Sequence, residues 1–185
     1  MADWLMRGGS ITREDREVCE FGLNQLFSSL TNFIFVLVLG FMFGIPVLSV
    51  AFFIAYTAIR VYAGGYHADT PVRCFFISIV ITVPAMLAIR YQQAWCTLVV
   101  FYCILGLSAA ALILLSPVGN KNKMPDALEK VVYRRRMLRN LVMLSVVAAG
   151  LFHFAYHDYA AAVLCGIMLA AIMAITGKIK LLQKS

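Results

Sequence analysis

The sequence predicts an all-α, polytopic membrane protein with six transmembrane helices. Of its 185 residues, 62% are hydrophobic and only 14% are charged, whereas a soluble globular chain is about half apolar. The apolar residues fall in long runs, each close to the roughly 20 residues that span the hydrocarbon core of a bilayer. The same composition excludes intrinsic disorder. We expect a single membrane domain over residues 1–185.

Turn-forming residues separate the apolar runs. Gly44, Pro46 and the Gly64-Gly65 pair mark the ends of the first two runs, and polar residues mark the others. Residues 116–140 are expected to form a polar loop, and residues 178–185 a basic tail. The expected membrane core, residues 21–177, contains spans at residues 24–43, 46–61, 75–89, 95–115, 141–156 and 159–176.

The first 20 residues mix charged and apolar side chains. Residues 11–20 are expected to form a short helix that lies on the membrane surface, because its charges can then stay in water. A frayed terminus is the alternative. In either case residues 1–20 form an interfacial segment ahead of the membrane core.

The positive charges lie almost entirely on one predicted side of the membrane. If both termini are cytoplasmic, fifteen of the sixteen Lys and Arg residues fall in cytoplasmic segments, and Arg90 alone lies outside. This asymmetry orients the chain by the positive-inside rule and explains the net charge of +7 without a nucleic-acid partner. We expect a multi-pass membrane protein whose termini and residues 62–74 face the cytoplasm. Arg134, Arg135 and Arg136 could contact anionic lipid or an acidic peptide.

The turn between the second and third spans concentrates side chains that can carry chemistry. Pro71 suits the first position of a helix, because no backbone N–H is required there, and Thr70 or Asp69 could cap that helix. Cys74 would then lie in the first turn, where free N–H groups and the helix dipole favour a thiolate. The full set is Arg60, Gly64, Gly65, His67, Asp69, Arg73 and Cys74.

A helix break between His67 and Cys74 would allow these two side chains to meet. In one unbroken helix they would lie about two turns, roughly 10 Å, apart, but a break at Pro71 lets the chain fold back. His67 could then take the thiol proton while Cys74 attacks a carbonyl carbon, and Asp69 could orient the imidazole. The alternative is that His67 is a polar turn residue and Cys74 an ordinary span residue, since one Cys and one His are weak evidence.

The same segment resembles a known family signature. The pattern of an Arg, then Gly-Gly-x-His-Ala, then a Cys seven residues after the His is similar to that of the accessory gene regulator B (AgrB) family. Members of that family are membrane cysteine endopeptidases of bacterial quorum sensing. Cys74 follows the matching run, which is Arg60-Val61-Tyr62-Ala63-Gly64-Gly65-Tyr66-His67-Ala68.

The resemblance implies an activity and partners. Such enzymes cleave an AgrD propeptide on the cytoplasmic side of the membrane through a thioester with the enzyme. A thiol or hydroxyl of the peptide then attacks that thioester, which gives a cyclic thiolactone or lactone autoinducer. The resemblance assigns His67 as general base and Cys74 as nucleophile. Arg60 would pair with a carboxylate or stabilise charge near the site, and Gly65 would serve the turn. It also implies a homodimer, and we expect no cofactor.

The remaining Cys and His residues carry weaker signals. Five cysteines without CxxC spacing indicate neither a disulfide framework nor a zinc site, and Cys96, Cys103 and Cys165 are interpreted as small hydrophobic residues. His153 and His157 are spaced i and i+4, so on one helix they would share a face, as metal ligands can. The alternative, an interfacial polar cap, is favoured because no third ligand is evident.

Two other classes of function compete with a peptidase. One is a small transporter or peptide exporter without catalysis, and the other is a membrane interaction protein. No charged residue lies in the middle of a predicted span, which argues against ion-coupled transport. A Cys74→Ser substitution separates the classes, because only the peptidase needs the thiol.

Overall fold

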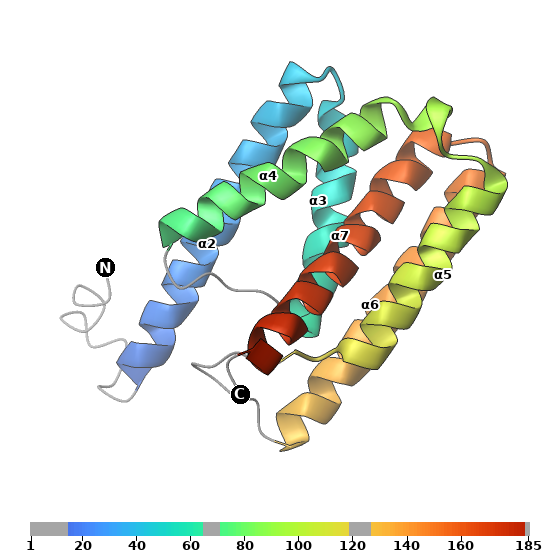
Figure 1. The fold of residues 1–185 in the computed structure, drawn as a ribbon. Coiled ribbons are helices and arrows are strands. Elements are labelled where there is room, and N and C mark those ends of the chain that lie inside the picture. The colour runs from blue at the N-terminus through green and yellow to red at the C-terminus, as the bar shows by residue number, and fades with distance from the viewer. Residues whose placement is uncertain (1–14, 65–70, 119–126, 184–185) are drawn as a thin grey trace. The chain divides into compact units, whose positions relative to one another are not determined.

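The computed structural model describes residues 15–64, 71–118 and 127–183 of the chain. All regular elements in these ranges are helical, which confirms the predicted all-α class. The elements are α2 (Asp15–Met42), α3 (Pro46–Ala63), α4 (Pro71–Arg90), the short 3-10 turn η1 (Gln92–Ala94), α5 (Leu98–Leu115), α6 (Ala127–His153) and α7 (His157–Gln183), as Figure 1 shows.

Three of the described helices are long and apolar enough to cross a membrane. They are α3, α5 and α7. Shorter apolar stretches lie in α2, over Ser29–Met42, and in α4, over Ile77–Arg90. The structure therefore supports a membrane protein, and the number of six transmembrane helices stays a prediction.

The chain divides into two units after Phe35, so the division falls within α2. The described part of the first unit is a continuous helix from Asp15 to Phe35. The second unit contains the end of α2 and all of α3 to α7. The expected single domain over residues 1–185 stays a prediction.

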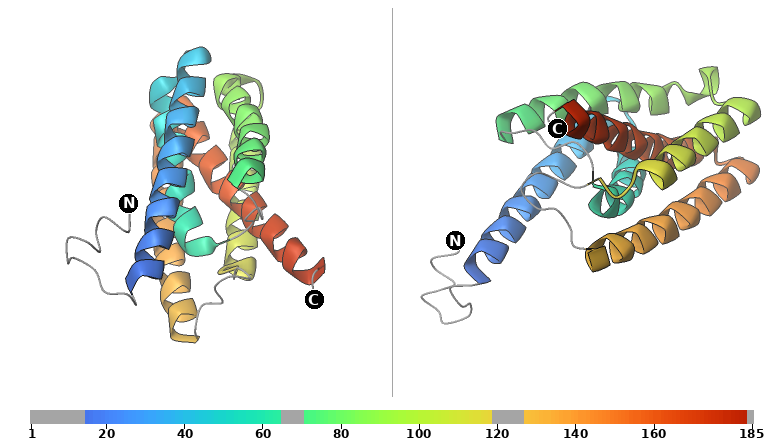
Figure 2. Two further views of the ribbon diagram at one scale, coloured as in Figure 1. Left: turned by 90° about the vertical axis from the view of Figure 1, so that its left-hand side faces the viewer. Right: turned by 60° about the horizontal axis from the view of Figure 1, so that its bottom comes forward.

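Helix α7 lies at the centre of the second unit. It packs against α3, α4, α5 and α6, and in Figures 1 and 2 it runs through the middle of this group. Small residues allow the close packing, as is usual in membrane helices. A Cβ atom at Gly166 would lie only 2.9 Å from the Cβ of Ala55 and from the backbone oxygen of Phe52. The backbones of α3 and α7 therefore approach each other closely at Gly166.

The N-terminal helix differs from the prediction. Residues 15–20 are the first turns of α2 and do not form a separate surface helix. Gly22 lies inside this continuous helix. One glycine costs a helix only about 1 kcal/mol relative to alanine, which does not end it here.

The polar segment 116–140 also differs from the predicted loop. Helix α6 begins at Ala127, so its first half contains Arg134, Arg135 and Arg136. Residues 127–140 include neither Gly nor Pro and consist largely of good helix formers. Met137 and Leu141 lie one turn apart and are both buried, which gives this basic stretch an apolar face to pack.

The turn between α6 and α7 comes earlier than predicted. Helix α6 ends at His153, and Ala155 adopts the left-handed conformation with φ +63°. The Tyr156 N–H donates to Leu151 O at 2.9 Å and the Ala155 N–H donates to Phe152 O at 3.3 Å. This pair of bonds is a Schellman motif, formed here without the usual glycine. His153 and His157 therefore belong to different helices, which removes the predicted shared face.

Candidate functional site

Helix α3 ends at the predicted motif. Gly64 follows its last residue with φ +69°, in the left-handed region that glycine adopts most readily. The Arg60 guanidinium donates a hydrogen bond to the Gly64 carbonyl oxygen. The motif arginine therefore holds the backbone at the point where the chain leaves α3.

The segment after α5 lies against this helix end. The Val118 N–H donates to Ala63 O at 2.9 Å, and Gly64 and Val118 form an isolated parallel β-bridge. A side chain at position 64 would overlap the Val118 carbonyl oxygen. The approach of the two backbones requires glycine at position 64.

Helix α4 begins at Pro71, as the sequence predicts, so Cys74 lies in its first turn. At this position the backbone N–H groups have no partner within the helix, and the helix dipole favours negative charge. His67, Gly65 and Asp69 lie outside the described residues. The contact between His67 and Cys74 and the role of Asp69 therefore stay predictions.

The basic half of α6 packs beside the ends of α3 and α5. The Asn140 side-chain amide donates to Ala58 O at 2.8 Å. The Arg136 guanidinium lies over the Tyr62 ring, 5.8 Å from its centroid, within cation–π range. Arg134 donates to Ile113 O at 3.4 Å. Tertiary packing thus brings the predicted basic residues to the end of α3 that carries the motif.

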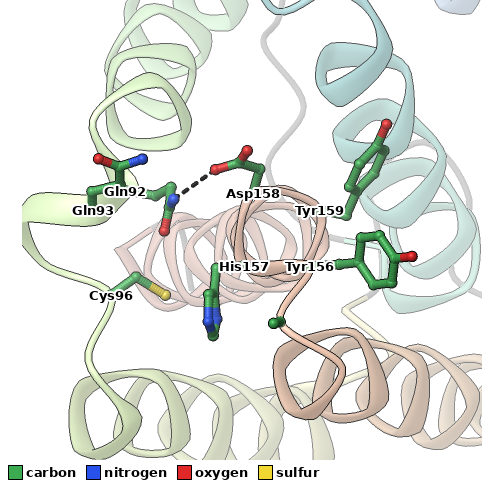
Figure 3. Close-up of a pocket in the computed structure, with 8 residues that line it drawn as sticks. Gln92, Gln93, Cys96, Tyr156, His157, Asp158 and Tyr159 are labelled. Carbon is green, nitrogen blue, oxygen red and sulfur yellow. Dashed lines mark hydrogen bonds between the residues drawn. The ribbon is translucent and has the colours of Figure 1, made fainter.

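A pocket lies beyond the other ends of α4 and α5. It has a volume of about 500 Å3, and Figure 3 shows its lining side chains. The Gln92 side-chain amide donates to Asp158 Oδ1 at 2.6 Å across it. No local spacing relates these two residues, which is why sequence reasoning missed them. The lining residues are Gln92, Gln93, Cys96, Ala155, Tyr156, His157, Asp158 and Tyr159.

Cys96 and His157 share this pocket and form a rival Cys–His pair. Figure 3 shows the Cys96 sulfur directed toward the His157 imidazole. Burial raises the pKa of the Cys96 thiol, so less of it is the reactive thiolate at neutral pH. An activated nucleophile needs the opposite environment, one that lowers the pKa of its thiol. Cys74, at the start of α4, therefore stays the predicted nucleophile.

The two histidines of the α6–α7 turn have separate partners. His153 Nε2 lies 3.0 Å from the Tyr102 hydroxyl, and the His157 ring packs edge-on against Phe152 at 4.8 Å between centroids. Among the described residues, no group of three or more Cys, His, Asp and Glu side chains could hold a metal ion.

The candidate site and the pocket occupy opposite ends of α5. Residues 92–97 precede this helix and Val118 follows it. A helix of 18 residues is about 27 Å long, close to the hydrocarbon thickness of a bilayer. Residues 58–64 and 116–118 thus meet at one end, and residues 92–96 and 155–159 at the other. This grouping matches the predicted sides, although which end is cytoplasmic stays a prediction.

Apolar helices of spanning length, with a basic cluster at one end, define an integral membrane protein. The chain matches the family model described as Accessory gene regulator B over residues 1–176, and it belongs to this family.

One curated relative is similar over part of its length. The chain is 30% identical over 70 residues to "Putative AgrB-like protein 2" of Clostridium perfringens (strain 13 / Type A), which covers 38% of this chain and 33% of that protein. The match thus spans about a third of the relative's length. No solved structure matches the chain.

Proposed function

We propose that the chain is a membrane cysteine endopeptidase that cleaves an AgrD-like quorum-sensing propeptide and cyclises one of the fragments. The observation that carries the proposal is the family match over residues 1–176, which includes the whole motif from Arg60 to Cys74. The start of α4 at Pro71 supports it, because the first turn of a helix favours a thiolate at Cys74.

The first step of the proposed reaction is acylation of Cys74. His67 accepts the thiol proton, and the Cys74 sulfur attacks the carbonyl carbon of the scissile peptide bond. The carbon–nitrogen bond breaks, His67 returns the proton to the leaving amine, and the C-terminal fragment departs. The N-terminal fragment stays bound to Cys74 as a thioester.

The second step is cyclisation. A thiol or hydroxyl within the bound fragment gives its proton to His67 and attacks the thioester carbonyl carbon. The bond to the Cys74 sulfur breaks, the Cys74 thiolate leaves, and a thiolactone or lactone ring closes. Water would compete as the attacking group, and an active site at the membrane boundary reduces access of water to the thioester. In the proposal, residues 62–74 face the cytoplasm.

The basic half of α6 is proposed to attract an acidic segment of the propeptide. Arg134, Arg135 and Arg136 are all exposed and lie on the helix that packs beside the end of α3. Anchoring to anionic lipid is the competing explanation. Arg135→Glu is the cleanest test, because the contacts of Arg134 with Ile113 and of Arg136 with Tyr62 stay in place. The Arg135→Glu variant should bind the propeptide more weakly than the wild type, and the difference should be larger at low salt than at high salt. Unchanged binding at low salt would support the lipid explanation.

The nucleophile is tested with purified protein in detergent and a synthetic propeptide. Cys74→Ala should abolish cleavage, and wild-type protein should form a hydroxylamine-sensitive adduct on Cys74 that mass spectrometry detects. The matched control replaces Cys19, Cys96, Cys103 and Cys165 together and should retain cleavage. Cleavage by Cys74→Ala, or an adduct on Cys96, would overturn the assignment.

The competing function is transport or export of a peptide without catalysis. A Cys74→Ser variant should then move the peptide as the wild type does, whereas the proposed peptidase loses its thioester. The proposed homodimer is tested by cross-linking in membranes, because it would give a band at twice the mass of the chain.

A further inference from the structure

We infer that residues 116–118, directly after α5, position the segment that carries His67 and Cys74. They do so by fixing the end of α3, from which that segment leaves. We call residues 116–118 the strap. This inference rests on the proposed function. It adds Val118 to the proposed machinery and gives Gly64 a role, because both act as positioning residues that do not touch the substrate.

The strap supplies a hydrogen bond that α3 cannot make internally. The last carbonyl groups of a helix have no partner within it. At the end of α3, the Ala63 oxygen accepts from the Val118 N–H at 2.9 Å, and the next oxygen, that of Gly64, accepts from the Arg60 guanidinium. Two successive carbonyl groups are therefore held, one by the motif arginine and one by the strap.

The strap is itself anchored in the core. Val118 is 7% exposed and belongs to the main apolar cluster of the second unit. Ser116 is 4% exposed, and its N–H continues the α5 pattern by donating to Leu112 O at 3.0 Å. A segment held at both of these points can fix its neighbour, whereas a solvent-exposed loop could not.

Gly64 makes the contact sterically demanding. Its φ of +69° is unfavourable for a residue with a side chain, and a Cβ atom would overlap the Val118 carbonyl oxygen. Any larger residue must push the strap away or rotate the peptide that leads toward position 67. In either case the point from which the segment carrying His67 and Cys74 leaves α3 would move. A misplacement of about 1 Å can cost an enzyme about 100-fold in rate.

Gly44 is a matched control for Gly64. It follows α2 with φ +71°, but a Cβ atom there would meet nothing within 4 Å. Gly44→Ala and Gly64→Ala therefore both place an alanine at positive φ, and only the alanine at position 64 overlaps the strap. Val118→Gly separates the strap from backbone strain at position 64, because it leaves Gly64 unchanged.

Two measurements on full-length protein in detergent test the inference. The first is propeptide cleavage, for which Gly64→Ala should lower kcat about 10- to 100-fold with little change in KM, while Gly44→Ala stays close to wild type. The second is the pH profile of Cys74 alkylation, in a background without the other four cysteines. Gly64→Ala should shift this profile and Gly44→Ala should not. The second readout needs no cleavage, so it still tests the strap if the proposed function fails.

A second pair of variants decides the question if Gly64→Ala does not fold. Val118→Gly keeps the N–H donor and removes the buried side chain that anchors the strap, whereas Val47→Gly removes an exposed side chain near Gly44. Val118→Gly should shift the pH profile of Cys74 alkylation, and Val47→Gly should leave it unchanged. The inference would be overturned if Gly64→Ala gave the same alkylation profile as Gly44→Ala, and Val118→Gly the same profile as Val47→Gly.

Discussion

The side-chain amide of Gln92 donates a 2.6 Å hydrogen bond to the carboxylate of Asp158, which joins the turn before α5 to the first turn of α7. Gln92 is only 4% exposed, so its amide has little access to water. Asp158 lies where the dipole of α7 favours negative charge. This one contact links the ends of two helices at the pocket, remote from the basic end of the bundle.

The two partners of this bond should differ in their effect on stability. Asp158→Ala leaves the buried Gln92 amide without its acceptor, which costs about 1–3 kcal/mol. Gln92→Leu leaves Asp158 exposed and able to bind water, so it should cost less. Denaturant unfolding in detergent would measure both, and the double variant would give their coupling. Additive effects of the two changes would show that the bond contributes nothing to stability.

Gly166 should tolerate no added methyl group. Its Cβ would lie 2.9 Å from atoms of Ala55, Phe52 and Tyr56, so Gly166→Ala should separate α3 from α7 at a cost of about 1–3 kcal/mol. Gly150 in α6 is the control, because nothing lies within 4 Å of its added Cβ. Gly150→Ala should be neutral or stabilising by up to about 1 kcal/mol. Thermal unfolding midpoints would compare the two, and equal shifts would contradict the close approach.

Cys96 should react slowly with alkylating reagents. Burial raises the pKa of its thiol, so at any pH near neutrality a smaller fraction is thiolate than in a free cysteine. In a protein whose only cysteine is Cys96, the alkylation rate should rise at a higher pH than for N-acetylcysteine. Mass spectrometry would follow the modification. A profile shifted to lower pH would restore Cys96 as a nucleophile candidate.

Accessibility labelling should separate the two ends of the bundle. In a cysteine-free background, a cysteine at Gln93 should react in intact cells with a membrane-impermeant maleimide, because this exposed residue lies at the predicted outer end. A cysteine at Ala68 should react only after the membrane is permeabilised. The reverse pattern would invert the orientation, and labelling of both in intact cells would refute the predicted topology.

Three helix ends were predictable because they depend on local backbone chemistry. Gly44 and Gly64 adopt positive φ where the sequence placed the ends of the first two spans, and Pro71 begins α4 where no N–H donor is needed. The predicted boundaries failed where a polar stretch was also a good helix. Residues 127–140 became the first half of α6 because an apolar face within that basic stretch packs on the core.

The sequence by itself determined the all-helical class, the family motif from Arg60 to Cys74 and the side of the bundle on which most cations gather. These properties follow from composition, from residue order and from backbone preferences within a few residues. Only the tertiary structure decided that Val118 holds the end of α3, that Arg136 reaches Tyr62 and that Gln92 meets Asp158. Each of these contacts joins different helices or turns, so it depends on how α7 gathers its neighbours, and no local pattern encodes that packing.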